Sequence, residues 1–339
     1  MRKQTTTLLA AAALLSSGAA WGYDISDRFQ INTLIEVEAF DTDDAEGDFS
    51  GVDGQDIELA TVEVGLEAQP TDRLSGHVLF LYEEGEGDEP VLDEGTVSFA
   101  FTDSLGLTAG KEYVPFGRFE TLVVTDPLTL ELGETNETVL QLDFGGGNWA
   151  GAVYGYSGDS TDASGDAREG IGIGMDFEQE SWIVGGSLIS NLGDSDLLQE
   201  VDGGGGAGVL NDDVPGLGLH AMGTFGAVTF IAEHVRALDD FVAGDLGGAV
   251  AADSQPTATN LEVGFEIGGG WAIAGAYRMT DEAQLAGLPE TMIAAAISYQ
   301  ITDQLGIALE VNSKEDYDLT DGGTGDDSRT VLGQLAVEF

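Results

Sequence analysis

One charged segment between two predicted strands carries the clearest chemistry in this sequence. Residues 109–142 form the longest stretch between clear strands that lacks simple alternation, and Pro115 and Pro127 interrupt regular structure there. Charged side chains that ring a water-filled passage decide which ions cross it. We predict that this segment narrows such a passage with Lys111, Arg118, Glu120, Asp126, Glu131, Glu134 and Glu137. The alternative is an ordinary outer loop with a structural turn.

Other residues of chemical interest do not indicate an enzyme. The three histidines, His77, His220 and His234, lie far apart, each in a predicted strand, so we predict no metal site there. No nucleophile motif is present, and triad chemistry depends on an arrangement that spacing alone does not reveal. Residues 170–174 imitate a dinucleotide-binding loop, but they lie inside an alternating strand and open no helix. We therefore predict neither catalysis nor a cofactor.

Two groups of acidic residues raise the question of calcium. Neither group has the twelve-residue spacing of an EF-hand, so a solvated loop with weak, low-affinity cation binding is favoured. The residues of the two groups are Asp41, Asp43, Asp44, Glu46 and Asp48, and Asp321, Asp326 and Asp327.

The elements that would hold these residues are strands with one apolar face. At the C-terminus, Val331, Gly333, Leu335, Val337 and Phe339 share one face, and residues 332, 334, 336 and 338 share the other. A period of two indicates a β-strand. The same alternation recurs over residues 29–38, 171–177, 262–267 and 305–312.

Short and long connections alternate between these strands. Residues 71–74, 102–105 and 302–305 share the form T-D-x-L, which suits a tight turn, and four further connections are equally brief. The long, acidic connections are placed at 41–56, 83–94, 115–137, 157–169, 190–216, 236–259, 279–290 and 312–328. Seven turns and eight loops join sixteen strands. The weakest strands are 149–156 and 217–225, so fourteen or eighteen remain alternatives.

This organisation predicts an all-β fold, a transmembrane antiparallel up-and-down β-barrel. Short periplasmic turns and long extracellular loops are typical of bacterial outer-membrane barrels, and an even strand number places both termini in the periplasm. Aromatic residues near predicted strand ends and the terminal Phe339 favour this fold over a soluble β-sandwich.

Composition supports export and excludes several classes. The chain has 62 acidic against 11 basic residues and no cysteine, which excludes nucleic-acid binding and disulfide stapling. Residues 1–22 have a basic start and a short apolar run, and are predicted to be a cleaved signal peptide before a barrel domain of residues 23–339. About two thirds of the acids fall in the long connections, which also suggests a halophilic, acidic protein.

The segment GKEYVPFGRFET followed by DPLTLELGET resembles the LbtU family of siderophore porins, and so do FQINTLIEVEAF, ATVEVGLEAQ and HVLFLYEE. The likeness is strongest from Phe29 to Leu142. It implies a β-barrel of monomeric type that admits a ferric siderophore without TonB coupling, and it supplies no binding residues. This chain departs from the family in its extreme acidity, and an excess of carboxylates would repel an anionic solute.

The sequence therefore predicts a porin in the outer membrane of a Gram-negative bacterium, serving ion transport, siderophore transport and iron uptake. The chain is too short for a 22-stranded TonB-dependent receptor with its plug. Its expected partners are a ferric siderophore or small hydrophilic solute, outer-membrane lipid and lipopolysaccharide, the barrel assembly machinery, and further copies of itself if it forms a homo-oligomer. The alternatives are a general cation-selective porin and a barrel with binding or adhesive loops and no open pore.

Overall fold

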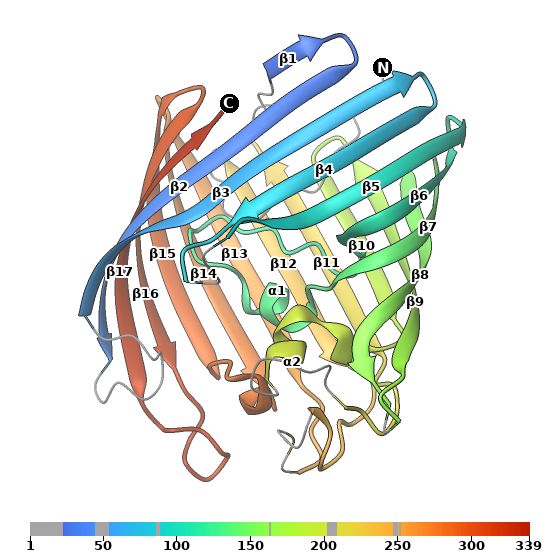
Figure 1. The fold of residues 1–339 in the computed structure, drawn as a ribbon. Coiled ribbons are helices and arrows are strands. Elements are labelled where there is room, and N and C mark those ends of the chain that lie inside the picture. The colour runs from blue at the N-terminus through green and yellow to red at the C-terminus, as the bar shows by residue number, and fades with distance from the viewer. Residues whose placement is uncertain are drawn as a thin grey trace.

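The computed structural model describes residues 23–44, 54–85, 89–162, 164–201, 209–246, 250 and 252–339. Sixteen antiparallel strands, β2 to β17, close into one barrel (Figure 1). Each strand pairs with its neighbours in sequence, and β17 pairs with β2. Thr33 and Phe339 exchange two backbone hydrogen bonds of 2.8 and 3.0 Å at this closure. The predicted sixteen-stranded barrel is confirmed, while the predicted signal peptide, residues 1–22, lies outside the described residues.

The strands have the following bounds. A short β1 (Tyr23–Ser26) pairs with the start of β2. The first half of the barrel contains β2 (Phe29–Asp44), β3 (Gly54–Thr71), β4 (Leu74–Tyr82), β5 (Val91–Thr102), β6 (Leu105–Tyr113), β7 (Asn136–Gly146), β8 (Trp149–Thr161) and β9 (Ala167–Gln179). The second half contains β10 (Trp182–Ile189), β11 (Gly216–Phe225), β12 (Val228–Ala237), β13 (Thr257–Gly268), β14 (Trp271–Asp281), β15 (Thr291–Thr302), β16 (Leu305–Glu315) and β17 (Asp327–Glu338).

Short helices occur only in the long connections of the described chain. They are α1 (Leu128–Gly133), η2 (Leu192–Asp194), α2 (Asp196–Glu200) and η4 (Gln284–Ala286). Among the described residues, no helix has both the length and the apolar character needed to cross a membrane.

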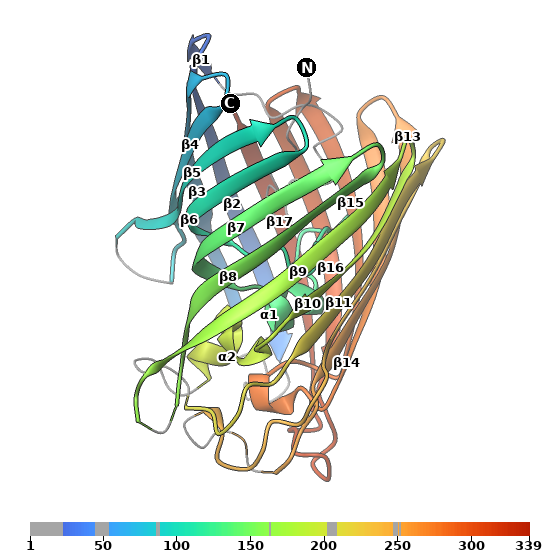
Figure 2. The same ribbon diagram turned by 90° about the vertical axis from the view of Figure 1, so that its right-hand side faces the viewer.

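The predicted turns form, and the threonine of the T-D-x-L motif explains why. The hydroxyl of Thr71 accepts hydrogen bonds from the backbone N–H groups of Arg73 and Leu74, at 3.3 and 3.0 Å. Thr302 accepts in the same way from Gln304 and Leu305, at 3.2 and 3.1 Å. These bonds satisfy N–H groups that leave the strand ladder. All seven short connections lie at one end of the barrel, and the long connections lie at the other (Figures 1 and 2).

The alternation places apolar side chains outside, whereas the inner face mixes polar, small and some larger apolar side chains. Val331 and Leu335 are more than 40% exposed on the outer surface, whereas Leu332 and Gln334, one residue away, are buried. The predicted faces of the terminal strand are therefore confirmed. An outer surface of this kind is what a barrel in lipid requires.

Aromatic rings gather mainly at the end of the barrel with the short turns. Trp149 stacks near Phe177, with ring centroids 4.7 Å apart, and Trp271 near Tyr299 at 4.5 Å. Of the aromatic residues near predicted strand ends, Tyr82 lies instead at the long-loop end. The rings at the short-turn end lie where such barrels carry one of their aromatic girdles.

Candidate pore and internal loop

The connection between β6 and β7, residues 114–135, turns into the barrel, and we call it the internal loop. Figures 1 and 2 both show α1, which belongs to it, within the outline of the barrel. Phe116, Val123 and Leu132 of this loop are at most 1% exposed. Pro115 ends the strand ladder because it has no N–H to donate, and Gly117 adopts a φ of 78°, which favours glycine.

Glu233, on the inner face of β12, holds the first part of the internal loop. Its carboxylate accepts hydrogen bonds from the backbone N–H of Arg118 at 2.6 Å and of Phe119 at 3.0 Å. The Thr129 hydroxyl donates a third bond to it at 2.9 Å. The loop's N–H groups have no strand partner, and a buried carboxylate needs donors, so each satisfies the other.

Two more carboxylates repeat this arrangement further along the loop. Glu262 of β13 accepts hydrogen bonds from the Thr121 hydroxyl, at 2.8 Å, and from the backbone N–H of Leu122. Glu310 of β16 accepts from both the backbone N–H and the hydroxyl of Thr125, at 3.0 and 2.7 Å. Three inward-facing glutamates, on β12, β13 and β16, thus hold successive turns of the loop against one wall.

Arg278 of β14 fixes the same stretch from its carbonyl side. Its guanidinium donates to the backbone carbonyls of Thr125 and Asp126, at 2.8 and 2.6 Å, and to the Glu262 carboxylate at 3.1 Å. The side chains of Arg278 and Glu262 are both fully buried. The delocalised cation with its fork of donors suits this role.

An apolar core fills the rest of the space between the internal loop and this wall. Leu128 and Leu132 of α1 belong to the same buried cluster as Ala258, Ala276 and Ala294 of β13 to β15. The small alanine side chains on the inner face leave room for a helix that a barrel of larger residues would exclude.

The glycines at 170, 172 and 174 have a steric role. A Cβ on Gly174 would lie 2.6 Å from the backbone oxygen of Pro115, in the internal loop. Cβ atoms on Gly170 and Gly172 would overlap the rings of Tyr156 and Tyr154. These glycines face inward, and the space that they leave in the lumen is occupied by the loop and two tyrosines.

The opposite wall, on β2 to β7, carries acidic side chains. By strand register its inward face includes Glu36, Glu38, Glu63, Glu67, Glu94, Glu112, Glu137 and Asp143, which we call the acidic wall. Among the described residues of β2 to β7, no lysine or arginine shares this face. His77 does, and its Nε2 lies 3.3 Å from the Glu94 carboxylate.

The structure separates the seven residues of the predicted constriction into groups. Arg118 and Glu120 lie together, 3.6 Å apart, and Arg118 also lies 3.6 Å from Asp176 of β9. Arg118 is therefore turned toward β9, away from the acidic wall. Asp126 and Glu131 form a second group, at a cavity described below.

The remaining three are Glu134, Glu137 and Lys111. Glu134 caps the end of α1, where its carbonyl accepts a bond from the N–H of Asp196. Glu137 lies on the inward face of β7, opposite Glu112, and accepts from the N–H of Asp159 at 2.9 Å. Lys111 pairs with Thr138 on the outer face of the wall, so it does not face the acids across the lumen as predicted. Strand alternation continues to Tyr113, which puts Glu112 inside and Lys111 outside.

A cavity of ≈ 430 Å³ lies where the internal loop meets β2 and β16, on the long-loop side. Glu38, Asp126, Glu131 and Lys314 provide its charges, and its apolar lining includes Leu128, Leu197, Leu288, Met292 and Leu332. Burial raises the pKa of Asp126 to about 6, against the attraction of the Arg278 guanidinium. Burial also raises the pKa of Glu131 to about 7, with Asp126 adding to the effect and Lys314 opposing it.

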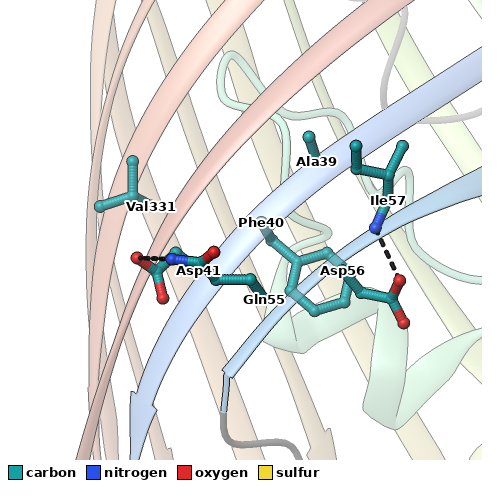
Figure 3. Close-up of a pocket in the computed structure, with 7 residues that line it drawn as sticks. All are labelled: Ala39, Phe40, Asp41, Gln55, Asp56, Ile57 and Val331. Carbon is teal, nitrogen blue, oxygen red and sulfur yellow. Dashed lines mark hydrogen bonds between the residues drawn. The ribbon is translucent and has the colours of Figure 1, made fainter.

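A second, more open hollow lies on the outer surface, at the long-loop ends of β17, β2 and β3 (Figure 3). Gln55 donates a hydrogen bond of 3.1 Å to Asp41 there, and Ile57 is 71% exposed. Of the acidic group that begins at Asp41, for which a solvated loop is favoured, Glu46 and Asp48 lie outside the described residues. No cluster of three or more metal-ligating side chains forms within the described ranges.

Sequence reasoning missed Arg278, Lys314 and the three glutamates that hold the internal loop. For Arg278, the alternation of β14 gives a signal. The inward positions of this strand are Ala274, Ala276 and Arg278, so an arginine follows two small residues on the face toward the lumen.

Comparison with known proteins agrees with the fold. No family model matches the chain. A UPF0422 protein of Coxiella burnetii is 26% identical over 295 residues, which is 79% of this chain and 61% of that protein. A UPF0422 protein of Legionella pneumophila is 25% identical over 334 residues, covering 84% and 62%. The chain therefore spans about three fifths of the length of these curated relatives.

The solved structures it resembles are outer-membrane porins. The outer-membrane channel DcaP of Acinetobacter baumannii matches with a TM-score of 0.64 at 12% identity, over 95% of this chain and all of that one. An anion-selective porin from Comamonas acidovorans matches with a TM-score of 0.66 at 10% identity, over 92% and 99%. Salmonella typhi OmpF, in complex with daunomycin, matches with a TM-score of 0.62 at 11% identity, over 94% and 99%. The fold is that of a porin, and it supports an outer-membrane channel.

Proposed function

We propose that the protein is an outer-membrane diffusion channel that passes cations and neutral solutes in preference to anions. The observation that carries this proposal is the acidic wall, which has inward-facing carboxylates on β2, β3, β5, β6 and β7 and, among its described residues, no lysine or arginine. A passage lined by one sign of charge concentrates counter-ions and repels ions of like sign.

We infer that the path narrows between the acidic wall and the internal loop. Glu38 of the wall and Asp126 of the loop both line the cavity, so carboxylates face the solute from both sides. The loop's Arg118 is held near Asp176, and Arg278 is buried behind the loop. Lys314 is the basic side chain among the residues that line the cavity.

We place the short turns and Phe339 in the periplasm and the long acidic loops outside the cell, in contact with lipopolysaccharide. The terminal strand, with its aromatic last residue, would then be the signal that the barrel assembly machinery reads. This orientation rests on the general rule that outer-membrane barrels have short periplasmic turns.

Reversal potentials in planar bilayers under a potassium chloride gradient test the proposal. We expect potassium to be preferred over chloride. A combined variant Glu36→Gln, Glu63→Gln and Glu94→Gln should lower that preference, whereas Asp303→Asn, in a short turn, should leave it unchanged. A preference for chloride, or no conductance from correctly folded protein, would refute the proposal.

We further propose that a ferric siderophore is among the solutes and that it crosses without TonB coupling. The support is that the region of resemblance, Phe29 to Leu142, contains the strands of the acidic wall and the internal loop. An acidic lumen restricts the solute to neutral or cationic chelates. Liposomes that contain only the purified protein should therefore admit a neutral ferric trihydroxamate chelate faster than an anionic ferric tris-catecholate chelate. Exclusion of both chelates by a conducting channel would contradict this part of the proposal.

A further inference from the structure

Three charged side chains line the ≈ 430 Å³ cavity without a protein partner. Asp126 and Glu131 come from the internal loop, and Lys314 comes from the inner face of β16. In the part of the chain that the structure describes, none of their side chains forms a hydrogen bond or an ion pair within 4.0 Å. This differs from Arg278 and Glu262 nearby, which are fully paired.

Glu131 and Lys314 are half-buried, and Asp126 is more exposed. A charge that loses part of its water without gaining a partner is costly. Here both signs occur in one cavity, but the side chains do not neutralise one another by contact. A solute that carries both charges would supply the missing partners on each side. A single metal ion would not supply them, because the ammonium group of Lys314 would repel a metal cation at this place.

The rest of the lining indicates an apolar body between the two charges of the solute. Leu128, Met292 and Leu332 are at most 5% exposed, and they line the cavity together with Leu197 and Leu288. Cavities of roughly 300–1,000 Å³ with an apolar lining and a few placed polar groups are typical of small-molecule sites.

We propose that this cavity binds a small zwitterionic solute with an apolar body, of the size of an amino acid or dipeptide. Asp126 and Glu131 bind the ammonium group of the solute, Lys314 binds its carboxylate, and the leucine and methionine side chains pack against its body. The proposal rests on the proposed function, because it names a solute class for the same passage.

The first experiment compares four probes by isothermal titration calorimetry with the purified, folded protein in detergent. L-leucine carries both charges and the apolar body, L-leucinamide carries only the cation, N-acetyl-L-leucine carries only the anion, and glycine lacks the apolar body. We expect L-leucine to bind most tightly, glycine roughly tenfold more weakly, and N-acetyl-L-leucine not at all. Binding of N-acetyl-L-leucine as tight as that of L-leucine, or binding of none of the probes, would overturn the proposal.

Two variants then separate the roles of the charges. Lys314→Met should weaken L-leucine roughly tenfold and leave L-leucinamide unchanged, because only the zwitterion has a carboxylate for Lys314. Glu131→Gln should weaken both. The matched control is Lys111→Met, on the outer face of β6, which should change neither. Equal losses for both probes in Lys314→Met would show a structural effect and would overturn the proposed role of Lys314.

Conductance of the same samples distinguishes this proposal from the proposed function. A cation-selective channel that binds no probe refutes the zwitterion site alone. A protein that binds L-leucine but conducts no ions refutes the channel and leaves the site in place.

Discussion

Removal of the buried Arg278 guanidinium should release the internal loop. Breaking a buried ion pair by removing one partner costs about 3–5 kcal/mol, since the other charge stays buried without its partner. At about 1.4 kcal/mol for each factor of ten, the Arg278→Met variant should shift the loop toward its detached state by about two to three and a half orders of magnitude. The partners lost include Glu262, the carbonyls of residues 125 and 126, and the Thr121 hydroxyl.

A double variant makes this prediction sharper. Arg278→Met with Glu262→Gln removes both charges, and replacing a buried pair as a unit is often close to neutral. We therefore expect the double variant to hold its loop better than the single variant. Arg236→Met is the control, because the hydrogen bonds of its side chain within the described residues go to Ala237 and Gln255, outside the internal loop.

Single-channel conductance and hydrogen exchange of the internal-loop peptides measure the outcome. A detached loop should widen the path, raise the conductance and lose protection from exchange. Conductance and protection equal to those of the unmodified protein in Arg278→Met, or a double variant at least as damaged as the single one, would show that this ion pair does not hold the loop.

Three further predictions follow from the same geometry. Arg118→Glu should raise cation selectivity if Arg118 borders the path, and unchanged reversal potentials would place it outside the pore. As pH falls through about 7 and then about 6, Glu131 and Asp126 take up protons and lose negative charge; cation preference should therefore decrease between pH 8 and 5, and a flat profile would contradict these pKa values. Gly174→Ala places a Cβ 2.6 Å from the loop backbone and should displace the loop, as seen by faster hydrogen exchange, whereas Gly155→Ala, with its nearest contact at 3.8 Å, should not.

The barrel could be predicted from the sequence because its signals are local. A period of two and the T-D-x-L turns each depend on a few neighbouring residues, and both the strand number and the weakest strands, now β8 and β11, are confirmed. Loop boundaries were less accurate, since β5 already begins at Val91 and β8 runs to Thr161, inside predicted loops. Strands that extend beyond the membrane lose the apolar alternation that would reveal them.

The attachment of the internal loop could not be predicted, because its partners are distant in sequence. Glu233 lies 115 residues from Arg118, whose backbone N–H donates a hydrogen bond to it. Glu310 lies 185 residues from Thr125, which donates to it in the same way. Which strands face each other inside a closed barrel depends on the whole sheet. Lys111 was misplaced for a simpler reason, namely that its charge was considered without the alternation of β6.

The acidity of the chain therefore has three different physical roles, and the net charge alone does not separate them. Acids of the long loops are mostly exposed, and water and salt screen them. Glu233, Glu262 and Glu310 instead accept backbone hydrogen bonds that hold the internal loop. The acidic wall belongs to neither group, since its carboxylates face the lumen with His77 as their basic neighbour. Neutralising loop acids should therefore alter solubility, whereas neutralising the wall should alter selectivity.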